Sequence, residues 1–157
     1  MFMTLERKEL LFKDLCSRLP YGVKAYVKNW SKSDRKYYEG VYTVESADPS
    51  LNTVLACSDK VSVEVIVGYD DYEIKPYLFP LSSMTNELWD KEFRGWGITE
   101  FTRDSFKYGC ETLEFYDGNP VLSDVSGFIN SLIKNHFDIY GLIPMGLALD
   151  ATGLNIY

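Results

Sequence analysis

The sequence predicts an α+β fold in which a small, strongly bent antiparallel sheet or barrel of the SH3-like kind packs against helices. Three observations support this prediction: a leucine stripe at helical spacing near the start, a run of short Val- and Tyr-rich segments, and a clear helical pattern near the end. The length of 157 residues and the 46% apolar content match one globular domain. We therefore expect a single domain over 1–157, with a barrel-like β region at about 20–80 and an α/β part at 85–157.

The first expected element is a helix over about residues 5–18, with Thr4 as its N-cap. Its apolar stripe consists of Leu10, Leu11, Leu15, Cys16 and Leu19. Pro20 follows directly and ends the helix. We interpret the stripe as a face that packs on the core, because apolar residues at this spacing usually do.

Short strands are expected next, separated by turn residues. They are VKAYV (23–27), YYEGVYTVES (37–46), TVLACS (53–58) and VSVEVIVG (61–68). Pro76 and Pro80 then exclude a central strand, because proline lacks the backbone N–H that a sheet ladder needs. We expect an edge strand there that runs into a tight turn.

The C-terminal half shows a second helix over about 86–93, capped by Thr85, and then a hairpin of ITEFT (98–102) and ETLEFYD (111–117). A longer amphipathic helix starts near Ser123. Its apolar positions are Val125, Phe128, Ile129, Leu132, Ile133, His136 and Phe137.

Composition narrows the function classes. The three cysteines, Cys16, Cys57 and Cys110, form no CxxC pair, so the sequence predicts neither a structural zinc site nor a disulfide framework. No apolar run approaches the roughly 20 residues that span a bilayer, and the N-terminal residues lack the apolar core of a secretory signal. We expect a soluble cytoplasmic protein without a metal, a cofactor or membrane contact.

No catalytic motif stands out. The single histidine, His136, is followed by Asp138, but neither an HExxH nor a GxSxG motif is present. We interpret His136 as a capping or core residue at the end of the last helix, where Asp138 would raise its pKa. The acidic residues Asp70, Asp71 and Glu73 fit no calcium loop and are interpreted as a solvated turn. The sequence therefore favours a protein that is not an enzyme.

The most distinctive segment is VKAYVKNWSKSDRKYYEG, where basic and aromatic residues interleave. The candidate binding residues are Lys24, Tyr26, Lys28, Trp30, Lys32, Arg35, Lys36 and Tyr38, with Tyr37 beside them. Cations hold a phosphate backbone and aromatic rings stack on bases, which favours nucleic-acid binding. Lysine-rich hairpin loops also protect sheet edges and aid solubility, and that alternative stays open.

Three blocks of the sequence carry a resemblance: LLFKDLCSRLPYGVK, EIKPYLFPLSSMT and NHFDIYGLIPMGLALDAT. They resemble a family of small proteins without an assigned activity from gut Bacteroides-type bacteria and their phages and mobile elements. That family commonly shows Tyr-Arg where this chain has Ile139-Tyr140, so the arginine is missing here. The resemblance implies a phage-associated protein in the cytoplasm of a bacterial host and assigns no catalytic residue.

Together these observations favour a non-enzymatic phage or mobile-element accessory protein that binds a host or phage protein. The net charge of −7 is concentrated in residues 61–157, which hold fifteen acids against six bases. Glu111, Glu114 and Asp117 form a candidate acidic face that mimics nucleic acid toward a host enzyme. The alternative is a nucleic-acid-binding small barrel that uses the 24–38 segment. A third interpretation is a hydrolase or metal enzyme built on His136 and scattered carboxylates.

Overall fold

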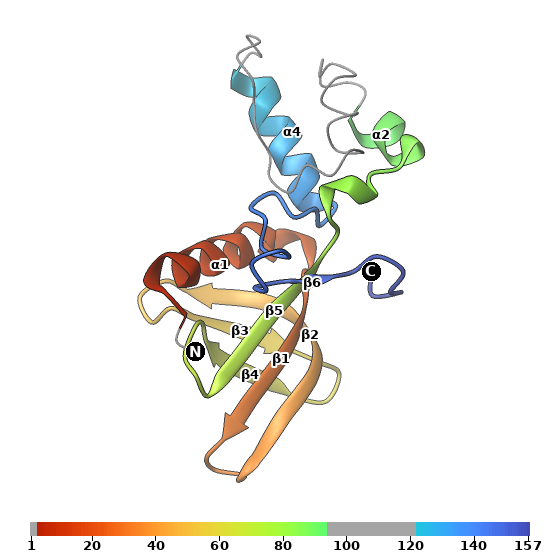
Figure 1. The fold of residues 1–157 in the computed structure, drawn as a ribbon. Helices are drawn as coiled ribbons and strands as arrows, with labels where there is room; N and C mark the ends of the chain where they lie inside the picture. The colour runs from red at the N-terminus through yellow and green to blue at the C-terminus, as the bar shows by residue number, and fades with distance from the viewer. Residues whose placement is uncertain (1–2, 94–121) are drawn as a thin grey trace.

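The computed structural model describes residues 3–93 and 122–157 (Figure 1). In chain order the elements are α1 (Leu5–Arg18), the 3-10 turn η1 (Leu19–Tyr21), β1 (Lys24–Ser31), β2 (Lys36–Asp48), β3 (Thr53–Cys57), β4 (Ser62–Ile66), β5 (Tyr72–Leu78), the 3-10 turn η2 (Leu81–Ser83), α2 (Asn86–Glu92), α4 (Leu122–Lys134) and β6 (Leu149–Asp150). The fold class is α+β, as the sequence predicts. The predicted hairpin at 98–102 and 111–117 lies outside the described residues, and so do Glu111, Glu114 and Asp117.

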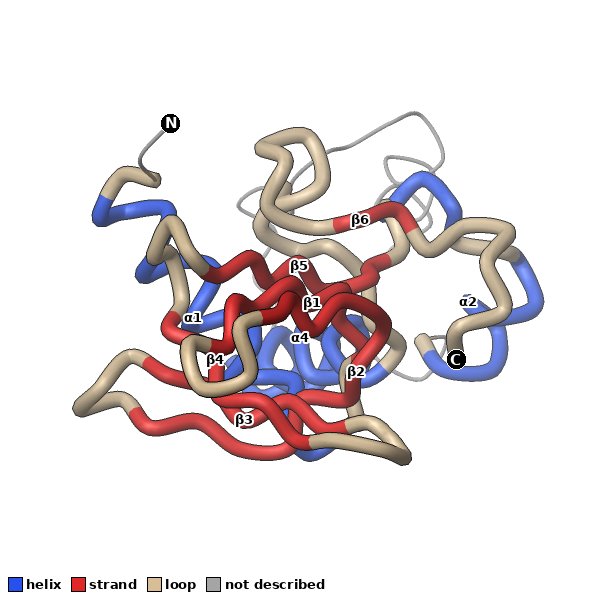
Figure 2. Tube along the Cα trace, turned by 90° about the horizontal axis from the view of Figure 1, so that it is seen from below, coloured by secondary structure: helices blue, strands red, loops and turns tan. Residues whose placement is uncertain are grey.

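The six strands form one mixed sheet in the order β4-β3-β2-β1-β5-β6, which is not closed into a barrel. Neighbouring strands are antiparallel except β5 and β6, which run parallel, so the purely antiparallel expectation is wrong at this edge. The sheet nevertheless curls strongly (Figure 2). The side-chain amide of Asn29 in β1 donates to the backbone carbonyl of Glu64 in β4, over 3.2 Å. The edge strand β4 therefore curves back over β1.

The two predicted helix N-caps and the first four predicted strands are confirmed. Thr4 accepts a hydrogen bond from Arg7 N (3.4 Å), and Thr85 accepts one from Leu88 N (3.1 Å). The expected edge strand is β5, which contains Pro76 and has β1 on one side. Its other side is covered by β6 only at Tyr77 and Leu78, because β6 is just two residues long. The edge-strand expectation is therefore wrong for those two residues.

The core consists of two apolar clusters. The first lies between α1 and the concave side of the sheet, and its most enclosed members are Leu11, Leu15, Val23, Ala25, Val27, Val44, Val54, Ala56, Val65, Val67, Leu78 and Leu142. The second joins η2, α2, α4 and the segment after α4, with Leu81, Met84, Trp89, Phe93, Phe128, Leu132, Ile133, Phe137 and Ile139. Figure 1 shows the consequence: α2 and α4 lie at one end of the molecule and the β1–β2 turn at the other.

A fully buried ion pair joins α1 to the end of α4. Arg18 and Asp14 have no exposed side-chain surface, and Arg18 donates to both carboxylate oxygens of Asp14, from Nη2 over 2.7 Å and from Nε over 2.9 Å. The remaining guanidinium donors reach the backbone carbonyls of Ile133 (3.2 Å) and Phe137 (2.7 Å). The guanidinium therefore neutralises a buried charge and caps carbonyls near the C-terminal end of α4.

The segment after α4 is held by a second buried carboxylate. Asp138 accepts hydrogen bonds from the backbone N–H groups of Leu142 and Ile143, both over 2.8 Å. It is 2% exposed, so these two charge-assisted bonds compensate for the loss of hydration. The chain then turns back to form β6 beside β5.

Candidate functional site

Four of the predicted binding residues share one face of the sheet. Lys24, Tyr26, Lys28 and Trp30 alternate along β1 with the buried residues Ala25, Val27 and Asn29, so they point away from the core. The strand register places residues of β2 and β5 beside them. We call this surface the outer face; it consists of Lys24, Tyr26, Lys28 and Trp30 of β1, Tyr37, Glu39, Val41 and Thr43 of β2, and Glu73, Lys75 and Tyr77 of β5.

The other four predicted residues lie elsewhere. Lys32 and Arg35 are exposed in the turn between β1 and β2. Tyr38 is on the opposite side of β2, packed against the first core cluster, with Lys36 Nζ 4.7 Å from its ring centroid. The predicted segment is therefore divided between the outer face, the turn and the inner side of the hairpin. A strand period of two separates residues in this way whenever they differ by an odd number of positions.

Trp30 and Tyr37 form the aromatic centre of the outer face. Their ring centroids are 4.8 Å apart with planes inclined by 55°, and Lys28 Nζ lies 5.2 Å from the centroid of Tyr37. Tyr37 is 57% exposed, and Val41, which follows beyond Glu39 on the same face of β2, is 48% exposed. The aromatic pair therefore presents apolar surface to solvent among charged side chains.

The hairpin carrying this centre extends beyond the rest of the sheet. The β1–β5 ladder ends at Asn29, whereas the β1–β2 ladder continues to the pair Ser31 and Lys36. Figure 1 shows this end of the hairpin reaching away from α2 and α4. Trp30 and Tyr37 therefore lie where only two strands are present and a partner has access from several directions.

The two acidic side chains of the hairpin, Asp34 and Glu39, accept hydrogen bonds from hydroxyl groups. Tyr26 Oη donates to Glu39 over 2.6 Å, which raises the pKa of Tyr26 to about 12. Asp34 accepts from the hydroxyls of Tyr38 and Ser31, and these bonds hold the pKa of Asp34 below its usual value. Both carboxylates therefore have oxygens that are already bonded within the hairpin.

Within the described residues, the cations of the hairpin form no ion pair with a carboxylate. Across residues 3–93 and 122–157, the ion pairs involve Arg18, Lys75, Lys91 and Lys134. The hairpin cations that form none are Lys24, Lys28, Lys32, Arg35 and Lys36. On β5, in contrast, Lys75 is paired with Glu73 over 2.8 Å.

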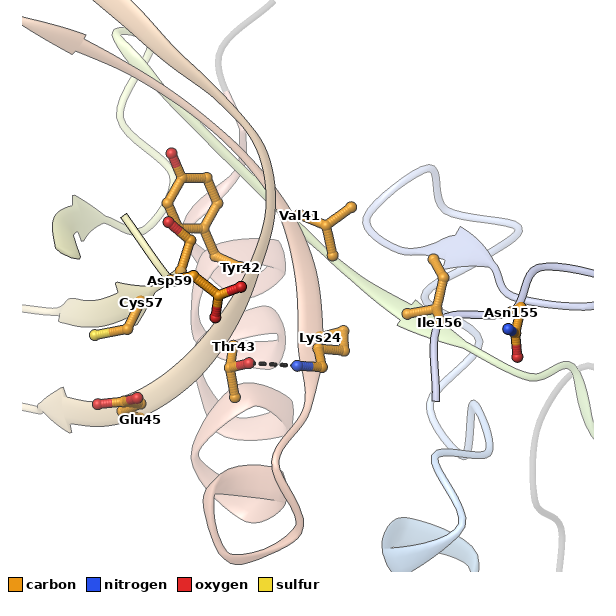
Figure 3. A pocket seen from close by; sticks show the side chains of 10 residues that line it. Lys24, Val41, Tyr42, Thr43, Glu45, Cys57, Asp59, Asn155 and Ile156 are labelled. Atoms are coloured by element: carbon orange, nitrogen blue, oxygen red, sulfur yellow. Dashed lines mark hydrogen bonds between the residues drawn. The ribbon is translucent and has the colours of Figure 1, made fainter. Parts of the chain in front are cut away.

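A shallow cleft of about 480 Å³ opens at the other end of the outer face, between β1–β3 and the C-terminal residues (Figure 3). Lys24 Nζ donates to Thr43 Oγ1 over 2.6 Å on one wall, and Asn155 and Ile156 form the opposite wall. Glu45 and Asp59 also line it. The cleft is open to solvent and its charges are of both signs.

The tail that forms this wall is anchored by Tyr157. Its hydroxyl donates to the carbonyl of Tyr77 (2.7 Å) and accepts from the backbone N–H of Lys24 (3.2 Å), which bridges β1 and β5 just past the end of their ladder. Its ring stacks on His136 with centroids 3.9 Å apart and planes inclined by 12°. Burial of the hydroxyl raises the pKa of Tyr157 to about 12.

We expect Tyr157→Phe to lower the free energy of unfolding by about 1 kcal/mol, because it removes one side-chain donor and leaves the carbonyl of Tyr77 without it. Urea unfolding followed by circular dichroism measures the change. Tyr69→Phe is the matched control, since Tyr69 is 62% exposed and its hydroxyl forms no hydrogen bond with the described residues. Equal effects of the two substitutions would show that the bridge is not stabilising.

His136 is buried, at 7% exposure, and follows the end of α4 with a left-handed φ of 61°. Its pKa is lowered to about 4, mainly by burial and secondly by the positive charge of Arg18. The expectation of a raised pKa is wrong, because burial of the imidazole disfavours its charged form and the nearby guanidinium of Arg18 adds to this effect. Within the described residues, the Nδ1 atom of His136 has no hydrogen-bond partner.

The acidic residues Asp70, Asp71 and Glu73 lie in and just after the β4–β5 turn. Asp70 and Asp71 are exposed in the β4–β5 turn, and Glu73 is paired with Lys75. No group of three or more His, Cys, Asp or Glu side chains converges on a possible metal position in the described segments. None of the described helices is long and apolar enough to cross a membrane.

Comparison of the chain with protein-family models, with curated proteins and with solved structures finds no match.

Proposed function

We propose that the protein acts by binding another protein through the outer face. The observation that carries the proposal is the aromatic centre, Trp30 packed on the exposed ring of Tyr37, at the end of a projecting hairpin. Tryptophan and tyrosine are enriched at protein interfaces, where a central aromatic anchor surrounded by polar residues supplies much of the binding energy. The cations and acids around this centre match such a polar rim.

The geometry supports nucleic-acid binding less well. Base stacking needs an accessible ring face, but Tyr37 has Trp30 against it and Lys28 over it. Lys36 lies on the inner side of the hairpin, and the other four cations are separated by residues without positive charge, so they do not match a backbone that carries a phosphate at every nucleotide. Acidic side chains, Glu39 and Glu73, interrupt the outer face itself.

The cellular role that we propose is that of a phage or mobile-element accessory protein in the cytoplasm of a bacterial host. It would bind a host or phage protein without catalysing a reaction. This part of the proposal rests on the three sequence blocks described above. We also propose that the sheet is an opened relative of SH3-like barrels, because β1–β4 form a curled antiparallel meander.

Affinity capture with surface variants tests the proposed function. Tagged wild-type protein is compared with the double variant Trp30→Ala/Tyr37→Ala in host-cell lysate, with and without nuclease treatment. We expect the wild type to retain a stoichiometric partner and the variant to capture about tenfold less of it, or lower still. The strongest interface anchors contribute about 2 kcal/mol or more, which corresponds to about thirtyfold in affinity.

The matched control is Leu51→Ala, which removes an apolar side chain of similar exposure (62%) in the β2–β3 turn, away from the outer face. The control should capture the partner as the wild type does. Retention of the partner by the double variant would contradict the proposed site. Loss of all captured material on nuclease treatment would contradict protein binding and favour nucleic acid.

A further inference from the structure

We propose that the outer face and the hairpin turn recognise an acidic polypeptide segment in an extended conformation, with apolar side chains between its carboxylates. The inference rests on the proposed function and specifies the chemistry of the partner. Three features of the hairpin support it: the internal bonding of its acids, the distribution of its cations along the aromatic centre, and its charge relative to the rest of the chain.

The first feature is the internal bonding of the acids. Glu39 accepts a hydrogen bond from the hydroxyl of Tyr26 over 2.6 Å, and Asp34 accepts one from the hydroxyl of Tyr38. Among the described residues, neither carboxylate forms an ion pair with a hairpin cation. The five hairpin cations accordingly have no ion-pair partner in the described segments, so an incoming carboxylate would not have to displace one.

The second feature is where the cations lie. Lys24 is at one end of the outer face, Lys28 lies against the aromatic centre, and Lys32 and Arg35 follow in the turn just beyond it. At about 3.3 Å per residue, the six steps from Lys24 to Trp30 span about 20 Å. A partner segment of similar length in an extended conformation would present side chains alternately, which suits carboxylates that meet the cations while apolar groups cover the rings.

The third feature is the contrast in charge. Residues 24–39 hold five Lys and Arg against two Asp and Glu, in a chain whose net charge is −7. The hairpin is thus a basic projection on an acidic protein. Such an arrangement steers an acidic segment to the hairpin and disfavours its contact with the remaining surface, which fixes where and how the partner docks.

The test uses three defined probes: a peptide that alternates glutamate with leucine and tyrosine, the same peptide with lysine in place of glutamate, and an oligothymidylate that matches the acidic peptide in charge. Each is titrated into the full chain by calorimetry, and amide chemical shifts locate the contact. We expect the acidic peptide to bind at Trp30, Tyr37 and the turn, more weakly as salt is raised. The lysine peptide should not bind there.

Charge reversal supplies the decisive comparison. The double variant Lys28→Glu/Arg35→Glu should weaken binding of the acidic peptide by about tenfold or more, since charge pairs at an interface are strongly coupled. The control Lys60→Glu reverses an exposed lysine in the β3–β4 turn and should change the affinity by less than about twofold. Circular dichroism confirms that each variant is folded.

The outcomes separate this inference from the proposed function. Equal binding of the acidic and lysine peptides at the outer face would overturn the acidic specificity and leave protein binding in place. Tighter binding of the oligothymidylate, with competition against the peptide, would overturn both. If none of the probes binds, the acidic specificity is overturned, while the capture experiment with Trp30→Ala/Tyr37→Ala still decides the proposed function.

Discussion

Replacing Arg18 by methionine is expected to lower the free energy of unfolding by about 3–5 kcal/mol, the largest effect that we predict for a single substitution. The methionine fills much of the same volume but leaves Asp14 as a buried carboxylate without its counter-ion. It also removes the donor to the carbonyl of Phe137, which ties α1 to the end of α4. Urea unfolding at neutral pH measures the loss.

Two further variants test the cause. Arg7→Met makes the same change at an exposed position of α1 and should alter stability by less than about 0.5 kcal/mol. The double variant Asp14→Leu/Arg18→Met removes both charges and should recover part of the loss, because no charge remains buried without a partner. A double variant that is less stable than Arg18→Met alone would contradict the explanation by an uncompensated charge.

This ion pair also shows why part of the fold could not be predicted from the sequence. Asp14 and Arg18 are four residues apart on a helix, a spacing that is typical of solvent-exposed pairs. Their burial depends on Ile133 and Phe137, more than a hundred residues further along the chain. In contrast, α1, α2 and β1–β4 follow from local signals: the caps Thr4 and Thr85, and alternating apolar residues between turns.

The candidate site shows the same division between local and non-local information. The alternation along β1 predicts that Tyr26 and Trp30 share a face, but the register with β2 decides which of its residues join them. Val41 joins the outer face and Tyr38 does not. The contribution of Tyr77 from β5 was missed because the two prolines of its segment obscured the strand period.

Acidification between pH 6.5 and about 4 is expected to destabilise the protein by about 3 kcal/mol through His136 alone. Burial and the charge of Arg18 lower the pKa of His136 from 6.5 to about 4 in the folded protein. At a pH between these two pKa values, His136 binds a proton in the unfolded chain but not in the folded chain. The stabilisation is therefore complete above pH 6.5 and is lost as the pH falls towards 4, since one pKa unit corresponds to about 1.4 kcal/mol.

His136→Asn isolates this contribution, because asparagine does not titrate and tolerates the left-handed backbone found at His136. Burial raises the pKa of Asp14, so the contribution of Asp14 to stability increases as the pH falls. Asp14 is present in both proteins, so this contribution cancels when they are compared. Urea unfolding of both proteins at pH 7 and pH 4.5 should show a smaller loss of stability for His136→Asn, by about 2 kcal/mol. Equal losses would mean that protonated His136 is accommodated in the folded protein, through movement of the ring away from Tyr157 and Arg18.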